Sequence, residues 1–126
     1  MSIETVRINA QGREQLIRLK RYTGIEHWNE LCRWALCISL AEVTRPPITK
    51  TGGDGGIDMS WRTFAGAQSE LYLALLRQRC VDDGLGSAPE TLNEQLRLHI
   101  QRGLGYLAGR KIRSITDLVS IVALAA

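Results

Sequence analysis

Hydrophobic and polar residues alternate at the start of the chain and then recur at the spacing of a helix. Within residues 4–9, Val6 and Ile8 point to one side and the polar residues between them point to the other. Strict alternation over a few residues is typical of a short strand with one face in contact with water. The first element is therefore predicted to be a strand.

Two helices are predicted next, over residues 11–22 and 27–41. Leu16 and Leu19 belong to one apolar stripe on the first helix, and Gly24 suits the left-handed backbone that ends a helix. The second helix carries two stripes: Trp28, Leu31, Ala35 and Ile38 in one, and Cys32, Leu36 and Leu40 in the other. Because a surface helix needs only one stripe, this helix is expected to be buried on two sides.

The periodicity fails over residues 42–60, which are predicted to form a long, flexible, exposed loop. Pro46 and Pro47 exclude a helix, and the glycines of residues 52–56 leave the backbone without a fixed shape. Loops of this length in small domains are usually functional or disordered. The end of the loop, residues 57–64, is compatible with a second short strand.

A third helix is predicted over residues 67–83. Its segment 71–76 is apolar almost all the way round, which predicts deep burial. After a glycine break, Ser87 and Glu90 have the spacing of a capping box and would begin a fourth helix, which continues toward Leu104.

Ser114 and Asp117 are placed to cap a last short helix. The pattern as a whole predicts a predominantly α-helical fold, with about five helices and one or two short strands. The 126 residues fit one domain with one hydrophobic core, and the sequence has no internal repeat. We therefore expect residues 1–126 to form a single domain.

The N-terminal third has the order of a ribbon-helix-helix unit: a short strand, a basic helix, a break and an apolar helix. In that architecture strands from two chains pair, and their outward side chains, here Thr5, Arg7 and Asn9, can contact the major groove of DNA. The alternative is that the first strand pairs within its own chain, for example with residues 57–64. The sequence leaves both arrangements open.

Composition changes this picture little. Hydrophobic residues make up 44% and charged residues 23% of the chain, which is ordinary for a globular protein, and the formal net charge of +3 is a mild basic bias. No signal peptide or membrane-length apolar run is present, so a cytoplasmic location without membrane contact is expected. Cys32, Cys37 and Cys80 lie in apolar helical contexts and are expected to be buried, reduced thiols.

Patterns that carry catalysis are absent from the sequence. His27 and His99 lie in helices, without cysteines at the spacing of metal ligands. The glycine run of residues 52–56 lacks the order of a phosphate-binding loop, because Lys50 precedes it. No catalytic residue, metal or cofactor is predicted, and the protein is not expected to be an enzyme. A nuclease that nicks DNA would need a cluster of metal-binding carboxylates, and the sequence pattern does not contain one.

Basic residues gather in two segments that contain almost no acid. The first segment holds Arg13, Arg18, Lys20 and Arg21, with only Glu14 to offset them. The second holds Arg97, Arg102, Arg110, Lys111 and Arg113. Two such clusters in one small domain can form a stripe that follows the phosphates of nucleic acid, although solvated helix faces give the same pattern.

Several longer segments carry a resemblance to a known family. They are IRLKRYTGI (17–25), WN and LCRWA (28–35), SWRTFAG (60–66), LYLALL with QRC (71–80) and HIQRGLGYL (99–107). These segments resemble DndE, the small E component of bacterial DNA phosphorothioation systems. The likeness extends from about residue 6 to residue 109 and is weakest over residues 42–56.

The resemblance implies a role in replacing a non-bridging phosphate oxygen of DNA by sulfur. In such systems a cysteine desulfurase supplies the sulfur, a C component with an iron–sulfur cluster activates it, and a D component hydrolyses ATP. The E component is implied to be a helical, tetrameric DNA-binding protein that prefers nicked duplex and binds it through basic surface residues.

The combined prediction is a DNA-binding accessory subunit that works with the C and D components. Self-association is expected through the apolar second and third helices or the apolar tail of residues 115–126. The candidate DNA contacts are Thr5, Arg7, Asn9, Arg13, Arg18, Lys20, Arg21, Arg102, Arg110, Lys111 and Arg113. The alternative is an adaptor that assembles the C and D components without touching DNA.

Overall fold

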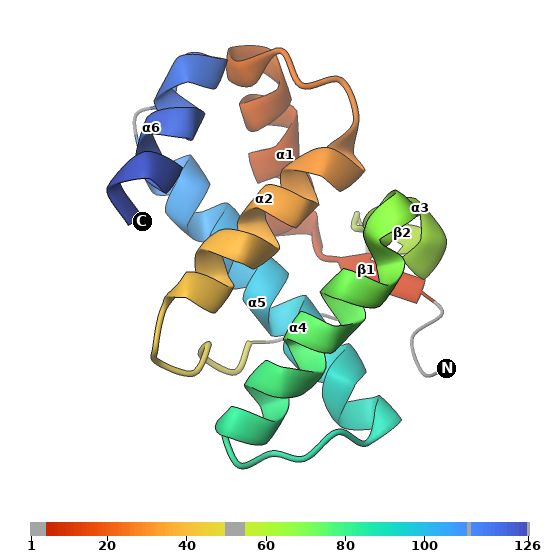
Figure 1. The fold of residues 1–126 in the computed structure, drawn as a ribbon. Helices are drawn as coiled ribbons and strands as arrows, with labels where there is room; N and C mark the ends of the chain where they lie inside the picture. Colours follow the sequence, from red (N-terminus) through yellow and green to blue (C-terminus); the bar gives the residue numbers. More distant parts are fainter. Residues whose placement is uncertain (1–4, 50–54, 111, 126) are drawn as a thin grey trace.

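The computed structural model describes residues 5–49, 55–110 and 112–125 (Figure 1). Its elements are β1 (Thr5–Ile8), α1 (Ala10–Thr23), α2 (Trp28–Ala41), β2 (Ile57–Ser60), α3 (Trp61–Ala65), the 3₁₀ turn η1 (Gly66–Gln68), α4 (Ser69–Asp82), α5 (Pro89–Gly109) and α6 (Ile115–Ala125). The predominantly helical fold is confirmed, since α1, α2, α4, α5 and α6 match the five predicted helices. The short α3 was not predicted and replaces the second half of the predicted second strand.

The long helix α5 is the centre of the packing, and α2 crosses it closely (Figure 1). Leu96, Ile100 and Leu104 follow one another at one-turn spacing on α5 and are at most 1% exposed. A Cβ atom on Gly103 would overlap the backbone carbonyl of Ala35 in α2. Glycine at this position therefore allows the two helix backbones to approach, and α1 and α4 pack against other parts of α5.

The two strands form an antiparallel pair in which Thr5 lies opposite Ser60 and Ile8 lies opposite Ile57. Val6 and Ile8 are buried in the core, while Thr5 is exposed, so the predicted division of faces is confirmed. Because β1 pairs with β2 of its own chain, the intramolecular alternative holds. The expectation of a ribbon-helix-helix unit, with β1 paired to a second chain, is wrong for this strand.

Helix ends follow the local chemistry in most places. Gly24 has φ of 75° after α1, which is the left-handed conformation predicted for it. At the start of α6, Ser114 Oγ accepts a hydrogen bond from the Asp117 amide, and Asp117 Oδ2 accepts one from the Arg113 amide. The capping box predicted at Ser87 is wrong: Ala88 holds the N-cap position of α5 without a side-chain bond, and a proline follows it.

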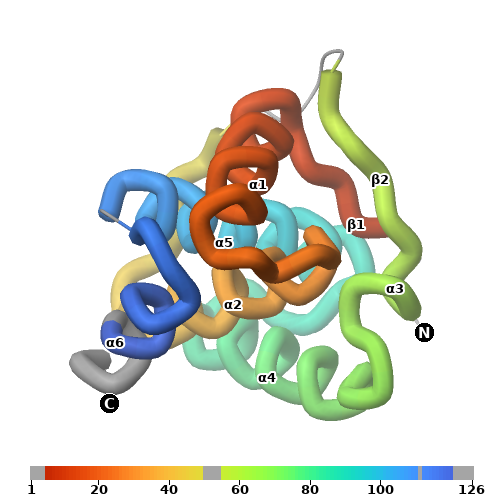
Figure 2. The backbone as a smooth tube through the Cα atoms, turned by 90° about the horizontal axis from the view of Figure 1, so that it is seen from above, coloured from red at the N-terminus to blue at the C-terminus, as the bar shows by residue number. Residues whose placement is uncertain are grey.

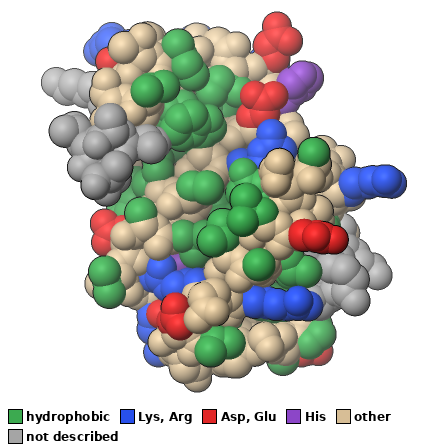
Figure 3. Space-filling view, in the orientation of Figure 1, with side chains coloured by type: hydrophobic (Ala, Val, Ile, Leu, Met, Phe, Trp, Pro, Cys, Tyr) green, Lys and Arg blue, Asp and Glu red, His purple; other side chains and the backbone are tan. Residues whose placement is uncertain are grey.

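Burial of α2 agrees with its two apolar stripes, since Leu31 and Ala35 of one stripe and Leu36 of the other are fully buried. The prediction of deep burial for residues 71–76 in α4 was wrong, because Leu71, Ala74 and Leu75 are exposed and only Leu76 is fully buried. Figure 3 shows the hydrophobic side chains that gather over α2 and α4 on this face.

The three cysteines have different environments. Cys32 and Cys80 are buried, as predicted, but Cys37 lies on an exposed part of α2, so the prediction was wrong for that residue. Burial raises the pKa of the Cys32 thiol to about 12, which leaves it protonated and unreactive. No helix in the described ranges combines the length and hydropathy needed to cross a membrane.

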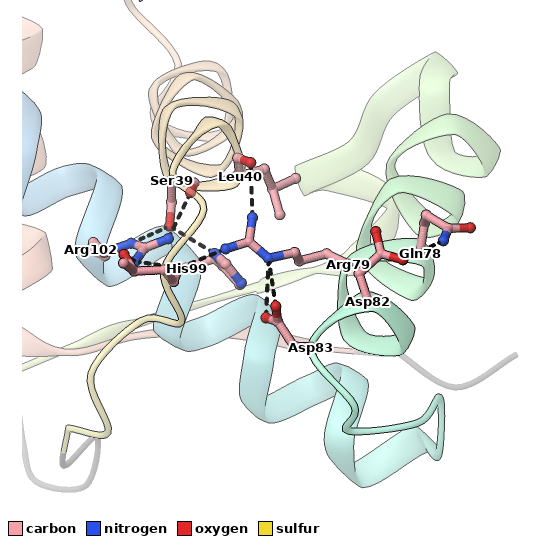
Figure 4. Close-up of polar contacts among 9 residues, drawn as sticks. Ser39, Leu40, Gln78, Arg79, Asp82, Asp83, His99 and Arg102 are labelled. Atoms are coloured by element: carbon pink, nitrogen blue, oxygen red, sulfur yellow. Dashed lines mark hydrogen bonds and ion pairs between the residues drawn. The ribbon is translucent and has the colours of Figure 1, made fainter.

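Two arginines hold the C-terminal end of α2 and the segment that follows it (Figure 4). Arg79 of α4 donates to the carbonyl oxygens of Leu40 and Thr44, and its Nε contacts the Asp83 carboxylate. Arg102 of α5 donates to the carbonyl oxygens of Ser39 and Thr44. The first part of the predicted flexible loop is thus bound to the helices, whereas residues 50–54 lie outside the described residues.

Candidate nucleic-acid interface

A hollow of about 170 Å³ lies between α1, the end of α5 and the segment that leads to α6. Its lining consists of Arg18, Leu19, Tyr22, Leu107, Ala108, Arg110, Ile112 and Arg113. Figure 2 looks down on α1, with the end of α5 and the start of α6 beside it. The fold therefore brings Arg18 of the first basic cluster together with Arg110 and Arg113 of the second.

Neighbouring apolar residues place these arginines. On α1, Leu19 is buried in the core at 2% exposure, while Arg18, one position earlier, is exposed. Ile112 is 4% exposed and anchors the chain between Arg110 and Arg113, which are both exposed. The amide of Arg113 is bound by Asp117, which fixes the backbone where α6 begins. We call this lining the basic hollow.

The basic hollow has an unbalanced positive charge. Its lining contains three arginines and no carboxylate. Within the described part of the chain, the guanidinium groups of Arg18, Arg110 and Arg113 form no ion pair or hydrogen bond. The acid nearest to Arg113 along the chain, Asp117, accepts a hydrogen bond from the Arg113 backbone amide at the start of α6. Three guanidinium groups without an internal acceptor can bind a phosphate through charge-assisted hydrogen bonds.

The remaining basic residues of α1 lie elsewhere. Lys20 lines a different hollow, which it shares with the carboxylates of Glu26 and Asp58. Arg13 lies 4.0 Å from the carboxylate of Glu14, and Arg21 is exposed. The first cluster is therefore divided between two sides of the helix. Lys111 lies outside the described residues.

The candidate contacts of β1 are also separate from the basic hollow. Thr5 and Arg7 line a third hollow, together with Glu90 and Glu94 of α5, where the charges are mixed. Arg7 contacts the Asp58 carboxylate at 3.1 Å. The Asn9 side chain caps α1 by accepting a hydrogen bond from the amide of Gly12 at 2.8 Å. The Arg7 and Asn9 side chains thus already have partners in the protein.

The Arg102 side chain is buried and bonded within the protein, so it is not available to DNA in this fold. It is 9% exposed, its Nε donates to Ser39 Oγ at 2.8 Å, and its Nη2 donates to the Ser39 carbonyl at 2.7 Å. The sequence carried a signal for this, because Arg102 follows Leu98, a buried residue, by one helical turn on α5. We therefore leave Arg102 out of the candidate interface.

His99 belongs to the same buried network. Its Nδ1 forms a hydrogen bond of 2.7 Å with Ser39 Oγ, which also accepts a hydrogen bond from Arg102 Nε. Burial, and then the positive charge of Arg102, lower the pKa of His99 to about 4. A neutral, fully buried histidine that is hydrogen-bonded to Ser39 has a structural role. The described residues include no group of three or more His, Cys, Asp or Glu side chains that could hold a metal ion.

Tyr22 also lines this site, but it was not among the predicted DNA contacts, which were chosen mainly for their positive charge. It lies one helical turn after Arg18, is 40% exposed and lines the basic hollow. The four-residue spacing from Arg18 on a helix was the signal that could have identified it.

Fold and site together define a small helical protein with an accessible basic hollow and no described metal centre. The fold matches the crystal structure of DndE from Escherichia coli B7A, a protein involved in DNA phosphorothioation modification, with a TM-score of 0.70 and 22% identity over 85% of this chain and 98% of that chain. The family model of the DNA sulphur modification protein DndE matches residues 5–114, and the chain belongs to this family. Comparison with curated proteins gave no match.

Proposed function

We propose that this protein is a non-catalytic, DNA-binding subunit of the DNA phosphorothioation machinery, and that it binds duplex DNA, nicked duplex in particular. The observation that carries the proposal is the basic hollow, where Arg18, Arg110 and Arg113 converge without a carboxylate in the lining. Membership of the DndE family supplies the biological setting. The C and D components of the machinery are its proposed protein partners.

Phosphate contacts give this binding mode a measurable signature. Each phosphate neutralised by an arginine releases condensed counterions, so the logarithm of the binding constant falls with the logarithm of salt concentration. Removing one phosphate contact should lower the magnitude of that slope by about one unit. Arg21, exposed on α1, and Lys111, which lies between Arg110 and Arg113 in the sequence, are proposed to extend the contact beyond the hollow.

The test is a fluorescence anisotropy titration of nicked and intact duplexes of one sequence over a series of salt concentrations. We expect Arg18→Ala, Arg110→Ala and Arg113→Ala each to lower the slope. Arg77→Ala is the matched control, because Arg77 is an exposed arginine of α4 that does not line the hollow. Unchanged slopes in all three hollow variants, or equal binding of nicked and intact duplex, would reject the corresponding part of the proposal.

Self-association is proposed to use the outward face of α2 and α4. Trp34, Cys37 and Tyr72 line a hollow of about 370 Å³ on this face, with Glu30 and Arg33 beside them. Leu71 and Leu75 of α4 are also exposed, at 52% and 42%. An isologous interface must be self-complementary, and apolar groups flanked by one acid and one base meet that condition. The tetramer is the proposed assembly, and because one isologous patch closes only a dimer, this face would form one of the two kinds of contact in it.

Light scattering after size exclusion tests this surface. We expect Leu75→Glu to reduce the molar mass toward that of the single chain, because it introduces a charge into an apolar contact. Val119→Glu changes an equally accessible apolar residue of α6, which is 52% exposed, and should leave the mass unchanged. The opposite result would assign self-association to α6 rather than to the α2–α4 face.

The adaptor function has one specific observation in its favour. Val43 and Ile48 are 91% and 85% exposed, while Thr44 between them is held by Arg79 and Arg102. An apolar tip on a fixed backbone loses little entropy on binding a protein partner. Co-purification with the C component from nuclease-treated extract, lost in Val43→Ser with Ile48→Ser, would favour this function if DNA binding fails.

A further inference from the structure

The two exposed tyrosines of the described chain differ in what covers their rings. Tyr106 of α5 is 36% exposed, and the guanidinium carbon of Arg102 lies 6.0 Å from its ring centroid. Tyr22 of α1 is 40% exposed, and its ring has no such partner within the described residues. Tyr22 is thus a partly exposed aromatic residue without an aromatic or cationic partner in the described chain, in the wall of a hollow that three arginines line.

Tyr22 and Arg18 are placed to act on one ligand. They are four residues apart on α1, which puts their Cβ atoms about 5–6 Å apart on the same side of the helix. Arg110 and Arg113 contribute to the same lining. A single ligand in this hollow therefore meets guanidinium groups and an aromatic ring together.

A nucleotide whose base is not paired combines the two chemistries that this lining offers. Its phosphate satisfies guanidinium groups, and its base presents a flat face on which an aromatic side chain can stack. Within an intact duplex, the faces of the bases are covered by their neighbours, so a protein contacts phosphates, sugars and base edges and cannot stack a ring on a base. An arginine cluster alone would serve to bind the phosphates of an intact duplex, and the Tyr22 ring would have no base on which to stack.

We propose that Tyr22 is a base-stacking residue and that the basic hollow receives one unpaired nucleotide of DNA. Its phosphate would contact Arg18, Arg110 and Arg113, and its base would stack on Tyr22. This inference rests on the proposed DNA-binding function and names the feature of the DNA that the hollow recognises: a displaced base, as at a bulge, a flap or a frayed end.

The experiment compares three duplexes of equal length and sequence by anisotropy at fixed salt. The first is fully paired, the second carries one extra unpaired nucleotide, and the third carries an abasic residue at that extra position, which keeps the phosphate and removes the base. Tyr22→Phe keeps the ring, Tyr22→Leu removes it, and Tyr106→Leu is the matched control at the other exposed tyrosine.

We expect the wild-type protein and Tyr22→Phe to bind the unpaired-nucleotide duplex about 5- to 150-fold more tightly than the abasic one, which is the range for stacking of one base on an aromatic ring. Tyr22→Leu should bind both equally and retain its affinity for the paired duplex. With 2-aminopurine as the unpaired base, fluorescence should be quenched by the wild-type protein and not by Tyr22→Leu.

The inference is overturned if Tyr22→Leu keeps the preference for the unpaired base, or if the wild-type protein has no such preference while it binds all three duplexes. Failure of the underlying DNA-binding function has a different signature, since the wild-type protein would then bind none of the three duplexes. A loss of preference in Tyr106→Leu as well would also overturn the assignment to Tyr22.

Discussion

Arg102→Leu separates arginines that hold the fold from arginines that face the solvent. The wild-type side chain donates hydrogen bonds to Ser39 Oγ, to the Ser39 carbonyl and to both oxygens of Thr44. Leucine retains part of the side-chain volume but removes every donor. The Ser39 carbonyl and hydroxyl would then remain buried at the end of α2 without this partner.

The expected loss of stability follows from the lost charged hydrogen bonds, since the Ser39 carbonyl keeps the Glu42 amide as a donor and the Ser39 hydroxyl keeps His99. A hydrogen bond to a charged group contributes about 1.5–3 kcal/mol, and the two bonds from Arg102 to Ser39 together give about 2–4 kcal/mol once some relaxation is allowed. That is a large share of the roughly 5–15 kcal/mol by which a domain is stable. Arg18→Leu changes an exposed side chain with no internal partner, so its effect should stay within about 0.5 kcal/mol.

Urea denaturation followed by far-ultraviolet circular dichroism measures the stability of each variant, and the salt dependence of DNA binding measures its phosphate contacts. We expect Arg102→Leu to lower the denaturation midpoint with an unchanged m-value and, while folded, to keep the wild-type salt slope. Arg18→Leu should keep the wild-type denaturation midpoint and lower the salt slope. Wild-type stability in Arg102→Leu, or a slope lowered by one unit in that variant, would refute the structural role of Arg102.

Two further predictions concern the packing and the buried histidine. Gly103→Ala would place a methyl group against the Ala35 carbonyl and should destabilise the protein by about 1–3 kcal/mol in the same denaturation assay, whereas Gly105→Ala, where a Cβ atom meets nothing, should not destabilise it. The pKa of His99 falls from its ordinary value of 6.5 to about 4 in the folded protein. Between these values the unfolded chain binds a proton that the folded chain does not, so stability should be full above pH 6.5 and fall as pH decreases toward 4, by up to about 3 kcal/mol. His99→Gln should flatten that part of the pH–stability curve, and His27→Gln, at an exposed position, should leave it unchanged.

The features that local chemistry determines could be predicted from the sequence. Alternation placed Val6 and Ile8 on the buried face of β1, and the left-handed Gly24 ended α1 as expected. The bonds made by Ser114 and Asp117 at the start of α6 also join residues only three and four positions apart. Each of these features is fixed by neighbours in the chain, which is why the sequence pattern was enough to predict it.

Features that depend on distant neighbours could not be predicted in this way. The segment of α4 around Leu71 and Leu75 is apolar on every side, so its pattern gives no direction, and the packing of Leu76 and Cys80 inward leaves the other two exposed. The pairing of β1 with β2 was one of two alternatives because four-residue strands carry little information about their partner. The meeting of Arg18 with Arg113 required the whole arrangement of α1, α5 and α6.

A count of basic residues overestimates the size of a DNA interface, because a guanidinium group can bind a backbone carbonyl as well as a phosphate. The C-terminal end of α2 has carbonyl oxygens that no helical amide satisfies, and cations are favoured there. Arg79 and Arg102 meet that need and are bound to protein acceptors. Arg18 and Arg113 have no such acceptor in the described chain, so their donors are satisfied only by water or by a ligand. The arginines of this fold are thus assigned by the acceptors within their reach, and the basic hollow is where protein acceptors are missing.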